Sequence, residues 1–491
     1  MAFIDSTVVN VAMPAIQASF HATVVGVQWV IESYGLFLAA LILVGGSLGD
    51  IFGRRRMFMV GVVLFAAASA ACGIALTTGQ LIIARSVQGV GAALLVPGSL
   101  ALISTSFDQK SRGQAIGTWS AFTAITTAVG PVLGGWLVEH ASWRWVFFIN
   151  VPIAAAVMII SFWRISESRG AVEARADWWR ALLATVGLGG FANGFIKLAA
   201  LGWSNPLVFC SLIIGAIAIV AFGLVETHVT VPMLPLSLFR SRSFSGANLL
   251  TLFLYAAIGI FFFLFPLNLI QVQGYSATAA GGAILPLILL MFLLSRWSGG
   301  LVARYGARGP LILGPLIAAL GFILFALPSI GESYWRTFFP AMIFLGLGMA
   351  VTVAPLTTVV MSSVNQDRVG TASGINNAVA RVAGVLAIAV LGVVMVKAFG
   401  FRLDNALAHL PLPPALLQEL HADRIKLAGL QVPAGLDPGM KIAIKNFIGE
   451  AFVFGFRIVM LICAGLSVAG TGVACSMIPK NSDAPRLGAR L

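Results

Sequence analysis

The chain has 491 residues, of which 59% are hydrophobic and only 10% are charged, and its mean hydropathy is +0.98. A soluble domain carries about 25% charged residues, so this composition excludes an ordinary soluble protein. The formal net charge of +13 does not indicate nucleic-acid binding, because the basic residues are spread over many short loops. The four cysteines lie singly in apolar segments, without metal or redox spacing, and we expect core residues there.

About fourteen apolar segments are long enough to span a bilayer. We place them at 1–20, 28–50, 57–76, 81–105, 112–138, 145–165, 180–200, 206–226, 244–271, 276–302, 309–328, 335–361, 368–396 and 451–478. The first is short for a span and no cleavable signal peptide precedes it, which suggests a truncated or misassigned start. An even number of spans puts both termini on the same side.

Basic residues gather in the connections on one side of the predicted bundle. These connections hold Arg54 to Arg56, Lys110 and Arg112, Arg164 to Arg180, Arg240 and Arg242, Arg304 and Arg308, and Arg368. Short loops on the other side, near 77–80, 200–205 and 272–275, contain no lysine or arginine. Because basic loops remain in the cytoplasm, we predict a multi-pass protein of the cytoplasmic (inner) membrane with both termini in the cytoplasm.

One long segment, 397–450, falls on the external side. Its proline-rich turns and helix-like periodicity predict two short amphipathic helices. A connection this long is either a binding cap or a loosely ordered connector, and the sequence favours neither.

The connection between the second and third segments reads Gly46-Ser-Leu-Gly-Asp-Ile-Phe-Gly-Arg-Arg-Arg56. It compresses a carboxylate, turn glycines and three arginines into one short loop. We predict that Asp50 pairs with Arg54 and Arg55 and that, with Gly46 and Gly53, this loop forms a latch between two helix bundles.

A second copy of this loop indicates an internal duplication. Aligning Gly53 with Gly306 matches the glycines, one leucine and one arginine, whereas Ala303 stands at the position of Asp50. Parallel halves of this kind are a transporter architecture. The separation of the two copies leaves room for two extra helices, at 180–200 and 206–226, which we expect to form a peripheral hairpin.

Several motifs follow one another along the chain: Phe3–Pro14 in the first segment, the Gly46–Arg56 loop, Leu81–Ala93 with its embedded Arg85, Gly130-Pro-Val-Leu-Gly-Gly135 in the fifth segment, and Trp143–Pro152. Together they resemble the motifs of the major facilitator superfamily, in particular its fourteen-helix drug:proton antiporter group. The resemblance implies an all-α membrane fold with two six-helix bundles and two extra helices. The corresponding divisions are 1–166, 167–243, 244–478 with the external loop, and a cytoplasmic tail at 479–491.

The resemblance also implies export of hydrophobic or cationic drugs in exchange for protons, by alternating access around a central cavity. The chain lacks a Gly-x-x-x-x-Gly-Lys phosphate loop, so the energy must come from an ion gradient. We therefore expect no cofactor and no metal. The expected partners are a small-molecule substrate, protons and the bilayer, with a monomer as the transport unit and a periplasmic adaptor if the host has an outer membrane.

Three ionisable residues in apolar segments are candidates for proton coupling, because such residues are costly and usually face a cavity. Asp5 is a candidate proton site, or an interfacial carboxylate that caps a short helix. Glu32 could carry a proton or attract a cationic drug in the external vestibule, or could be a solvated rim residue. Arg85 is expected to bond to backbone carbonyls or to a carboxylate such as Asp5, either as a proton-dependent switch or as a structural clamp.

Small residues and a proline in the fifth segment predict a close helix contact and a kink. By the family resemblance, Gly130, Pro131, Gly134 and Gly135 are an antiporter motif, although a generic packing motif would look the same. Asn376, Asn377 and Arg381 form a polar patch that we assign to the substrate cavity, where the asparagines line the cavity or act as a gate. The aromatic run 261–265 either lines a drug cavity or faces lipid, and lipid is the more frequent explanation.

Other functional classes leave signs that this sequence lacks. A membrane-embedded enzyme needs clustered histidines or carboxylates, and the five histidines are scattered in loops. A membrane sensor needs an appended soluble domain. An exporter of a single endogenous metabolite, lipid or siderophore remains an alternative that the sequence does not separate from a multidrug exporter.

Overall fold

The computed structural model describes residues 1–106, 129–168, 178–229, 236–364, 369–408, 424–430 and 437–479, together with the single residues 122, 126, 413, 417, 420 and 432. All regular elements within these residues are helical. Twelve of them are long and apolar enough to cross a membrane. A helix satisfies its own backbone hydrogen bonds, which a bilayer requires because it offers no water to do so.

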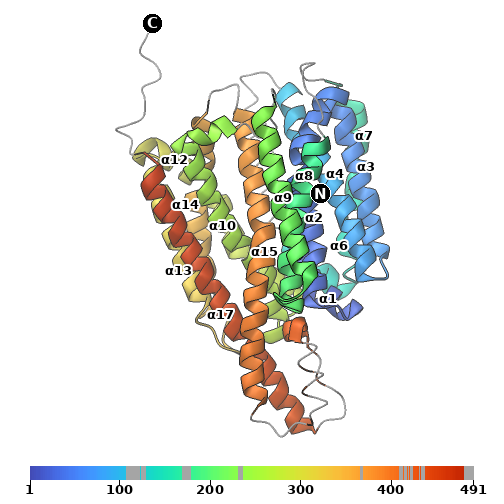
Figure 1. Cartoon of the computed structure of the whole chain (residues 1–491), viewed down its shortest axis with the longest axis vertical. Helices are drawn as coiled ribbons and strands as arrows, with labels where there is room; N and C mark the ends of the chain where they lie inside the picture. The colour runs from blue at the N-terminus through green and yellow to red at the C-terminus, as the bar shows by residue number, and fades with distance from the viewer. Residues whose placement is uncertain are drawn as a thin grey trace.

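The first part of the chain, here called the N half, begins with four long helices and ends with a broken one (Figure 1). Its elements are α1 (Ala2–Phe20), α2 (Val24–Phe52), α3 (Arg54–Ile74), α4 (Thr78–Ser106), a helix described from residue 129 to 140, α6 (Trp145–Phe148) and α7 (Asn150–Arg164). α4 packs against α2 and α3, and α7 covers α3. The predicted span 112–138 lies largely outside the described residues.

Two further helices, α8 (Trp178–Leu201) and α9 (Pro206–His228), follow the N half and pack against each other. α8 also contacts α2 and α15, whereas α9 leaves most of its apolar residues exposed. Two polar contacts join the pair: Arg180 and Glu226 form a buried ion pair at 3.2 Å, and Asn193 donates to Ser211 at 2.8 Å. These contacts hold the hairpin together where apolar packing alone would be weak.

The last part of the chain, the C half, contains the remaining spans. Its elements are η1 (Leu236–Arg240), α10 (Arg242–Leu267), η2 (Asn268–Val272), α11 (Ala277–Gly282), α12 (Leu285–Tyr305), α13 (Arg308–Phe325), α14 (Phe338–Ser362), α15 (Val369–Leu407), η4 (Arg424–Gly429) and α17 (Pro438–Met477). α13 packs between α14 and α17, and α10 packs against α15 and α17. The fold is therefore two six-helix bundles with two extra helices, as predicted.

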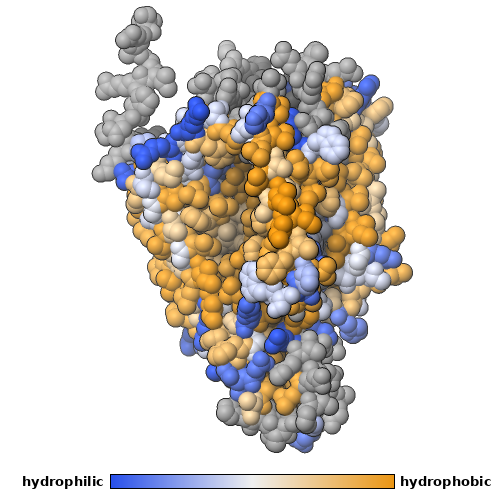
Figure 2. Space-filling model, viewed as in Figure 1, coloured by the Kyte–Doolittle hydropathy of each residue, from blue (hydrophilic) through white to orange (hydrophobic). Residues whose placement is uncertain are grey.

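Successive helices run in opposite directions, so their connections alternate between two ends of the bundle. The end with the α2–α3 and α12–α13 connections is called the basic end, and the other the far end. Gly53 and Gly306 have φ values of 110° and 74°, a region that only glycine enters easily. Each of these glycines separates two consecutive helices at the basic end. The two aligned loop copies therefore have the same structural role. Figure 2 shows an apolar band between more hydrophilic ends.

The external segment is shorter than predicted, because the flanking helices continue past their apolar stretches. α15 runs on to Leu407 and α17 begins at Pro438, and both project beyond the other helices at the far end (Figure 1). The predicted boundaries of these two helices, at residues 397 and 450, are wrong because hydropathy falls there although the helical backbone continues. The predicted amphipathic helices fall mostly outside the described residues.

The aromatic run on α10 does not face lipid, contrary to the favoured expectation. Phe261, Phe263 and Phe265 are at most 1% exposed. Phe261 stacks on Phe265 at a centroid distance of 4.9 Å, and both contact Phe325 of α13. These rings form the core of the C half, where they bury large apolar surfaces.

Candidate functional site

Asp5 and Arg85 meet in the interior of the N half, although 80 residues separate them. Asp5 lies in the first turn of α1, and Arg85 lies two turns into α4. Arg85 Nη1 donates to Asp5 Oδ2 at 2.5 Å, and the two side chains are 1% and 0% exposed. The expected contact between these residues is therefore present. An interfacial capping role for Asp5 does not fit its complete burial.

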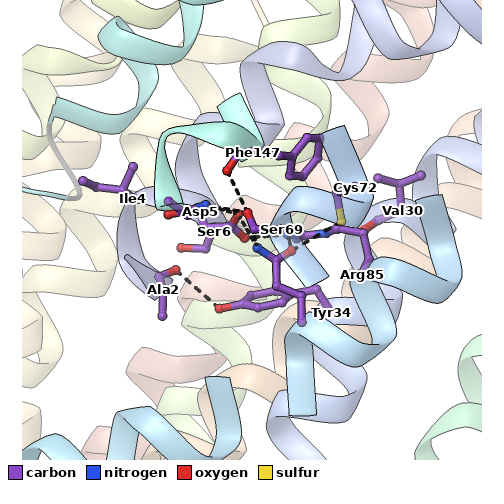
Figure 3. A network of polar contacts seen from close by, with 12 residues as sticks. Ala2, Ile4, Asp5, Ser6, Val30, Tyr34, Ser69, Cys72, Arg85 and Phe147 are labelled. Carbon is purple, nitrogen blue, oxygen red and sulfur yellow. Dashed lines mark hydrogen bonds and ion pairs between the residues drawn. The ribbon is translucent and has the colours of Figure 1, made fainter. Parts of the chain in front are cut away.

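A ring of neutral polar side chains surrounds this ion pair (Figure 3). Gln88 Nε2 and Asn150 Nδ2 both donate to Asp5 Oδ1, at 2.9 and 3.1 Å. The same two amides donate to Ser69 Oγ, which itself donates to the Phe147 carbonyl at 2.8 Å. We call Asp5, Ser69, Arg85, Gln88 and Asn150 the Asp5 network. It draws side chains from α1, α3, α4 and α7 into one buried cluster.

Arg85 has further partners that do not depend on Asp5. Its Nε donates to the Val30 carbonyl of α2 at 3.1 Å, and Nη1 also donates to Gln88 Oε1 at 2.7 Å. The guanidinium lies over the Tyr34 ring, 4.3 Å from its centroid, in a cation–π arrangement. Arg85 therefore stays held within the N half if Asp5 loses its charge.

Glu32 of α2 is buried where the N half meets the C half, and it does not lie in a solvated vestibule. We call this α2–α15 interface the seam. It is 0% exposed, and neither carboxyl oxygen has a hydrogen-bond partner among the described residues. One turn before it, Gln28 donates to the Ile388 carbonyl of α15 at 3.3 Å. One turn after it, a methyl group at Gly35 would lie 3.2 Å from Val385 Cγ2 of α15. This carboxyl group belongs to the α2–α15 interface, and the solvated-rim alternative is wrong for this structure.

The glycines of the predicted antiporter motif lie where two backbones touch. Added side chains at Gly130 and Gly134 would overlap Thr7 and Val8 of α1, and one at Gly135 would overlap the Ala277 carbonyl of α11. The 129–140 helix thus sits between α1 of the N half and α11 of the C half. Small residues are required here because the helix axes approach too closely for any Cβ.

Several hydrogen bonds join the halves at the far end. The backbone N–H of Thr278 donates to Glu139 Oε2 at 3.2 Å, one turn beyond Gly135. Gln17 of α1 donates to the Lys426 carbonyl of η4 at 3.0 Å and accepts from Gln271 of η2 at 2.8 Å. η4 also contacts α2, so these residues of the external segment are packed against both halves. The far end is closed in this structure.

In the predicted latch loop, the described hydrogen bonds of Arg55 and Arg56 stay within the N half. Gly53 separates α2 from α3, and the Arg54 backbone N–H donates to the Ser168 carbonyl at 2.8 Å. Glu167 accepts from the backbone N–H groups of Arg55 and Arg56 at 3.0 and 3.2 Å. Gly46 lies on α2, where a methyl group would be 3.8 Å from Pro97 of α4. The side chain of Asp50 lies outside what the structure describes, so its pairing stays a prediction.

One residue of the predicted polar patch on α15, Asn376, bonds to α10. Asn376 Nδ2 donates to Thr251 Oγ1 at 2.7 Å and to Asn248 Oδ1 at 3.2 Å, both on α10. Asn377 is exposed, and Arg381 is half-buried one turn before Val385. Asn376 therefore ties α15 to α10, and the assignment of the three residues to the substrate cavity stays a prediction.

Sequence reasoning missed three members of the Asp5 network. Gln88 follows Arg85 by three residues, so both project from one helix face. Asn150 lies within the Trp143–Pro152 motif, and Ser69 is a polar residue in an otherwise apolar helix. The helical spacing of Gln88 relative to Arg85 was a usable signal, whereas nothing in the sequence linked Ser69 or Asn150 to Asp5.

A helical bundle in two halves, with a buried ion pair in one half and a buried carboxyl group where the halves meet, is typical of multi-span membrane transporters. The family model described as Major Facilitator Superfamily matches residues 1–388. The chain belongs to this superfamily.

Several proteins similar to this chain are named as drug or antibiotic resistance proteins. The multidrug resistance protein Stp of Mycobacterium tuberculosis is 33% identical over 94% of this chain and 87% of its own length. The tetracenomycin C resistance and export protein of Streptomyces glaucescens is 33% identical, with coverage of 96% and 88%. The methylenomycin A resistance protein of Bacillus subtilis is 32% identical, with coverage of 80% and 85%.

Solved structures share the fold at low sequence identity. A bacterial homologue of the human lysosomal transporter Spinster, in an inward-facing and unoccupied conformation, aligns with a TM-score of 0.60 at 17% identity, covering 96% of this chain and 94% of that one. The xylose transporter XylE from E. coli, in an inward-open conformation, aligns with a TM-score of 0.55 at 13% identity, covering 98% and 94%.

Proposed function

We propose that this protein exports drugs or antibiotics across the cytoplasmic membrane in exchange for protons. The observation that carries the coupling is the fully buried Asp5–Arg85 pair within an apolar helix bundle. Ionisable groups at membrane depth are expensive to retain, and a transporter driven by a proton gradient needs a group that binds and releases a proton. The resistance activities of the similar proteins support drug export.

Asp5 is the proposed proton carrier. As a carboxylate it accepts hydrogen bonds from Arg85, Gln88 and Asn150. A proton on Asp5 cancels its charge and weakens the bond to Arg85, whose remaining bonds to Val30 and Gln88 keep it in place. Proton arrival thus changes the charge of the cluster without unfolding it. A shift in charge of this kind can bias the balance between two conformations.

Glu32 is a proposed second proton site, whose protonation state affects the interface between α2 and α15. A buried carboxyl group without hydrogen-bond partners is accommodated at least cost as the neutral acid. Opening the far end must separate α2 from α15, where Gln28 and Gly35 flank Glu32. Water then reaches the carboxyl group and allows it to ionise. A proton taken up from the outside would favour closure of the far end.

The basic end is proposed to face the cytoplasm, because its loops carry the arginines. Because the far end is closed, we assign this structure to the inward-facing half of the proposed cycle. The Asp50 loop is proposed to latch the basic end in the opposite, outward-facing state, which agrees with the contacts of Arg55 and Arg56 staying within the N half here. We propose a monomer as the transport unit, with a periplasmic adaptor only in a host that has an outer membrane.

Transport into everted membrane vesicles tests the proposal. We expect uptake of several antibiotics or cationic dyes from a compound panel, and loss of that uptake when an uncoupler removes the proton gradient. Uptake that resists the uncoupler would exclude proton coupling. Uptake of one compound alone would favour an exporter of a single substrate.

A further inference from the structure

A long apolar groove runs along the outside of the N half between α3 and α7. Its volume is about 800 Å³. Its lining residues are Met57, Met59, Val60, Val63, Leu64 and Ala67 of α3, Met158 and Phe162 of α7, and Arg55, Arg56 and Glu167 at one end. Val60, Val63 and Phe162 are 48%, 52% and 61% exposed, so the groove opens on the surface that faces the bilayer.

The charged end of the groove carries two guanidinium groups and one carboxylate. Arg55 lies 5.5 Å from the centroid of Phe162 and donates to the Ile165 carbonyl at 2.8 Å, which fixes its side chain at the rim. Arg56 lies 3.8 Å from Glu167, and its side chain is 68% exposed. An exposed pair at this distance contributes little, and both Glu167 oxygens already accept backbone N–H groups. The Arg56 guanidinium can therefore bind another anion.

The groove has the length of one lipid leaflet. From Arg55 to Ala67 a helix advances about 18 Å, and half of a hydrocarbon core is about 15 Å thick. The arginines mark the basic end, where a phosphate headgroup would lie, and the apolar walls continue toward the middle of the bilayer. Basic sites between membrane helices bind anionic lipid headgroups in this way.

We propose that this groove is a binding site for one anionic phospholipid of the leaflet at the basic end. Its phosphate and anionic headgroup bind Arg55 and Arg56, and one acyl chain lies between α3 and α7 against Val60, Val63 and Phe162. The bound headgroup competes with Glu167 for the Arg56 side chain. Since Glu167 joins the residues after α7 to the loop of the predicted latch, lipid occupancy acts on that loop directly.

Native mass spectrometry of the full chain tests the site without any transport assay. The purified protein in detergent is mixed with equal amounts of phosphatidylglycerol and phosphatidylcholine of matched acyl chains. We expect one phosphatidylglycerol to be retained several-fold in preference to phosphatidylcholine. Arg56→Gln is expected to abolish the preference, and Val63→Trp, which fills the groove, is expected to lower retention of both lipids.

Arg240→Gln is the matched control, because it removes an exposed arginine at the basic end outside the groove. It is expected to leave the preference unchanged. Equal retention of the two lipids by the unmodified protein would show unspecific annular lipid and overturn the proposal. A preference that Arg56→Gln leaves intact, or that Arg240→Gln removes equally, would also overturn it. Because the experiment measures lipid binding, none of these results bears on the proposed transport function.

Discussion

Arg85 Nη1 of α4 lies 2.5 Å from Asp5 Oδ2 of α1, and neither side chain is more than 1% exposed. Both charged groups are shielded from water, so each is stabilised by the other and by the neutral amides around them. Removing one partner of such a pair leaves an uncompensated buried charge, which costs about 3–5 kcal/mol. The two residues are not equivalent in this respect, because Arg85 has other hydrogen-bond acceptors in Val30 and Gln88, whereas Asp5 without Arg85 loses its ion-pair partner.

Arg85→Ala is therefore expected to destabilise the protein by about 3–5 kcal/mol, and Asp5→Asn by clearly less. In Asp5→Asn the guanidinium keeps its bonds to Val30 and Gln88. Denaturant unfolding in detergent measures both. Arg402→Gln is the control, since its pair with Glu450 spans 4.0 Å between side chains that are 52% and 53% exposed. Equal losses for Arg85→Ala and Arg402→Gln would contradict a buried, coupled pair.

Glu32→Gln is expected to keep the far end closed while removing part of the pH dependence of transport. Glutamine is neutral and of similar shape, so it imitates the protonated acid in the α2–α15 seam. The measurement is the initial rate of substrate export at a series of external pH values, with exposed Glu450→Gln as control. If the rate of Glu32→Gln followed external pH as the unmodified protein does, Glu32 would not be a proton site.

Gly135→Val is expected to trap the protein with an open far end. A side chain there overlaps the Ala277 carbonyl of α11, so the 129–140 helix cannot return to its closed position. Accessibility of a cysteine placed near this contact, probed from the far side with a membrane-impermeant reagent, should rise several-fold. Gly223→Val on α9 is the control, since no atom lies within 4 Å of its added Cβ. Unchanged accessibility in Gly135→Val would mean that the close approach is dispensable.

The Glu139 contact predicts a pH limit for far-end closure. The pKa of Glu139 is lowered from its ordinary value of 4.5 by the neighbouring Thr278 hydroxyl and by the Thr278 backbone N–H that its carboxylate accepts. A lowered pKa means that the contact is complete above pH 4.5 and weakens as the pH falls through the lower, closed-state value. Spin labels at the exposed positions Ala141 and Ala279, with Cys210 and Cys475 replaced by serine, report the distance. Glu139→Gln should show no such acid-dependent widening.

Hydropathy and loop charge predicted the fold because the bilayer restricts a chain to helices of spanning length. The same reasoning misplaced the ends of α15 and α17, since the helical backbone continues beyond the apolar surface that marks a span. It also favoured lipid for Phe261, although a fully buried aromatic core in the C half has the same composition as a lipid-facing helix. Composition reports that a residue is apolar and not which neighbour covers it.

Only the charged residues of the candidate site could be predicted from the sequence. Asp5 and Arg85 stood out because charged residues are rare in apolar helices. Ser69 and Asn150 join them through tertiary packing of α3 and α7. Neutral polar residues are common in membrane helices, so their presence does not indicate a functional site. The seam position of Glu32 likewise depends on the packing of α2 against α15, which no local pattern of either helix reveals.

Substrate-driven proton movement tests the central claim most directly. The protein is reconstituted into liposomes that contain a pH-sensitive dye, and an identified substrate is added on one side without any imposed proton gradient. We expect the substrate gradient to drive protons in the opposite direction in the unmodified protein and in Arg402→Gln, and to drive none in Asp5→Asn. Undiminished proton movement in Asp5→Asn, in protein shown to be folded, would contradict the assignment of Asp5 as the coupling site.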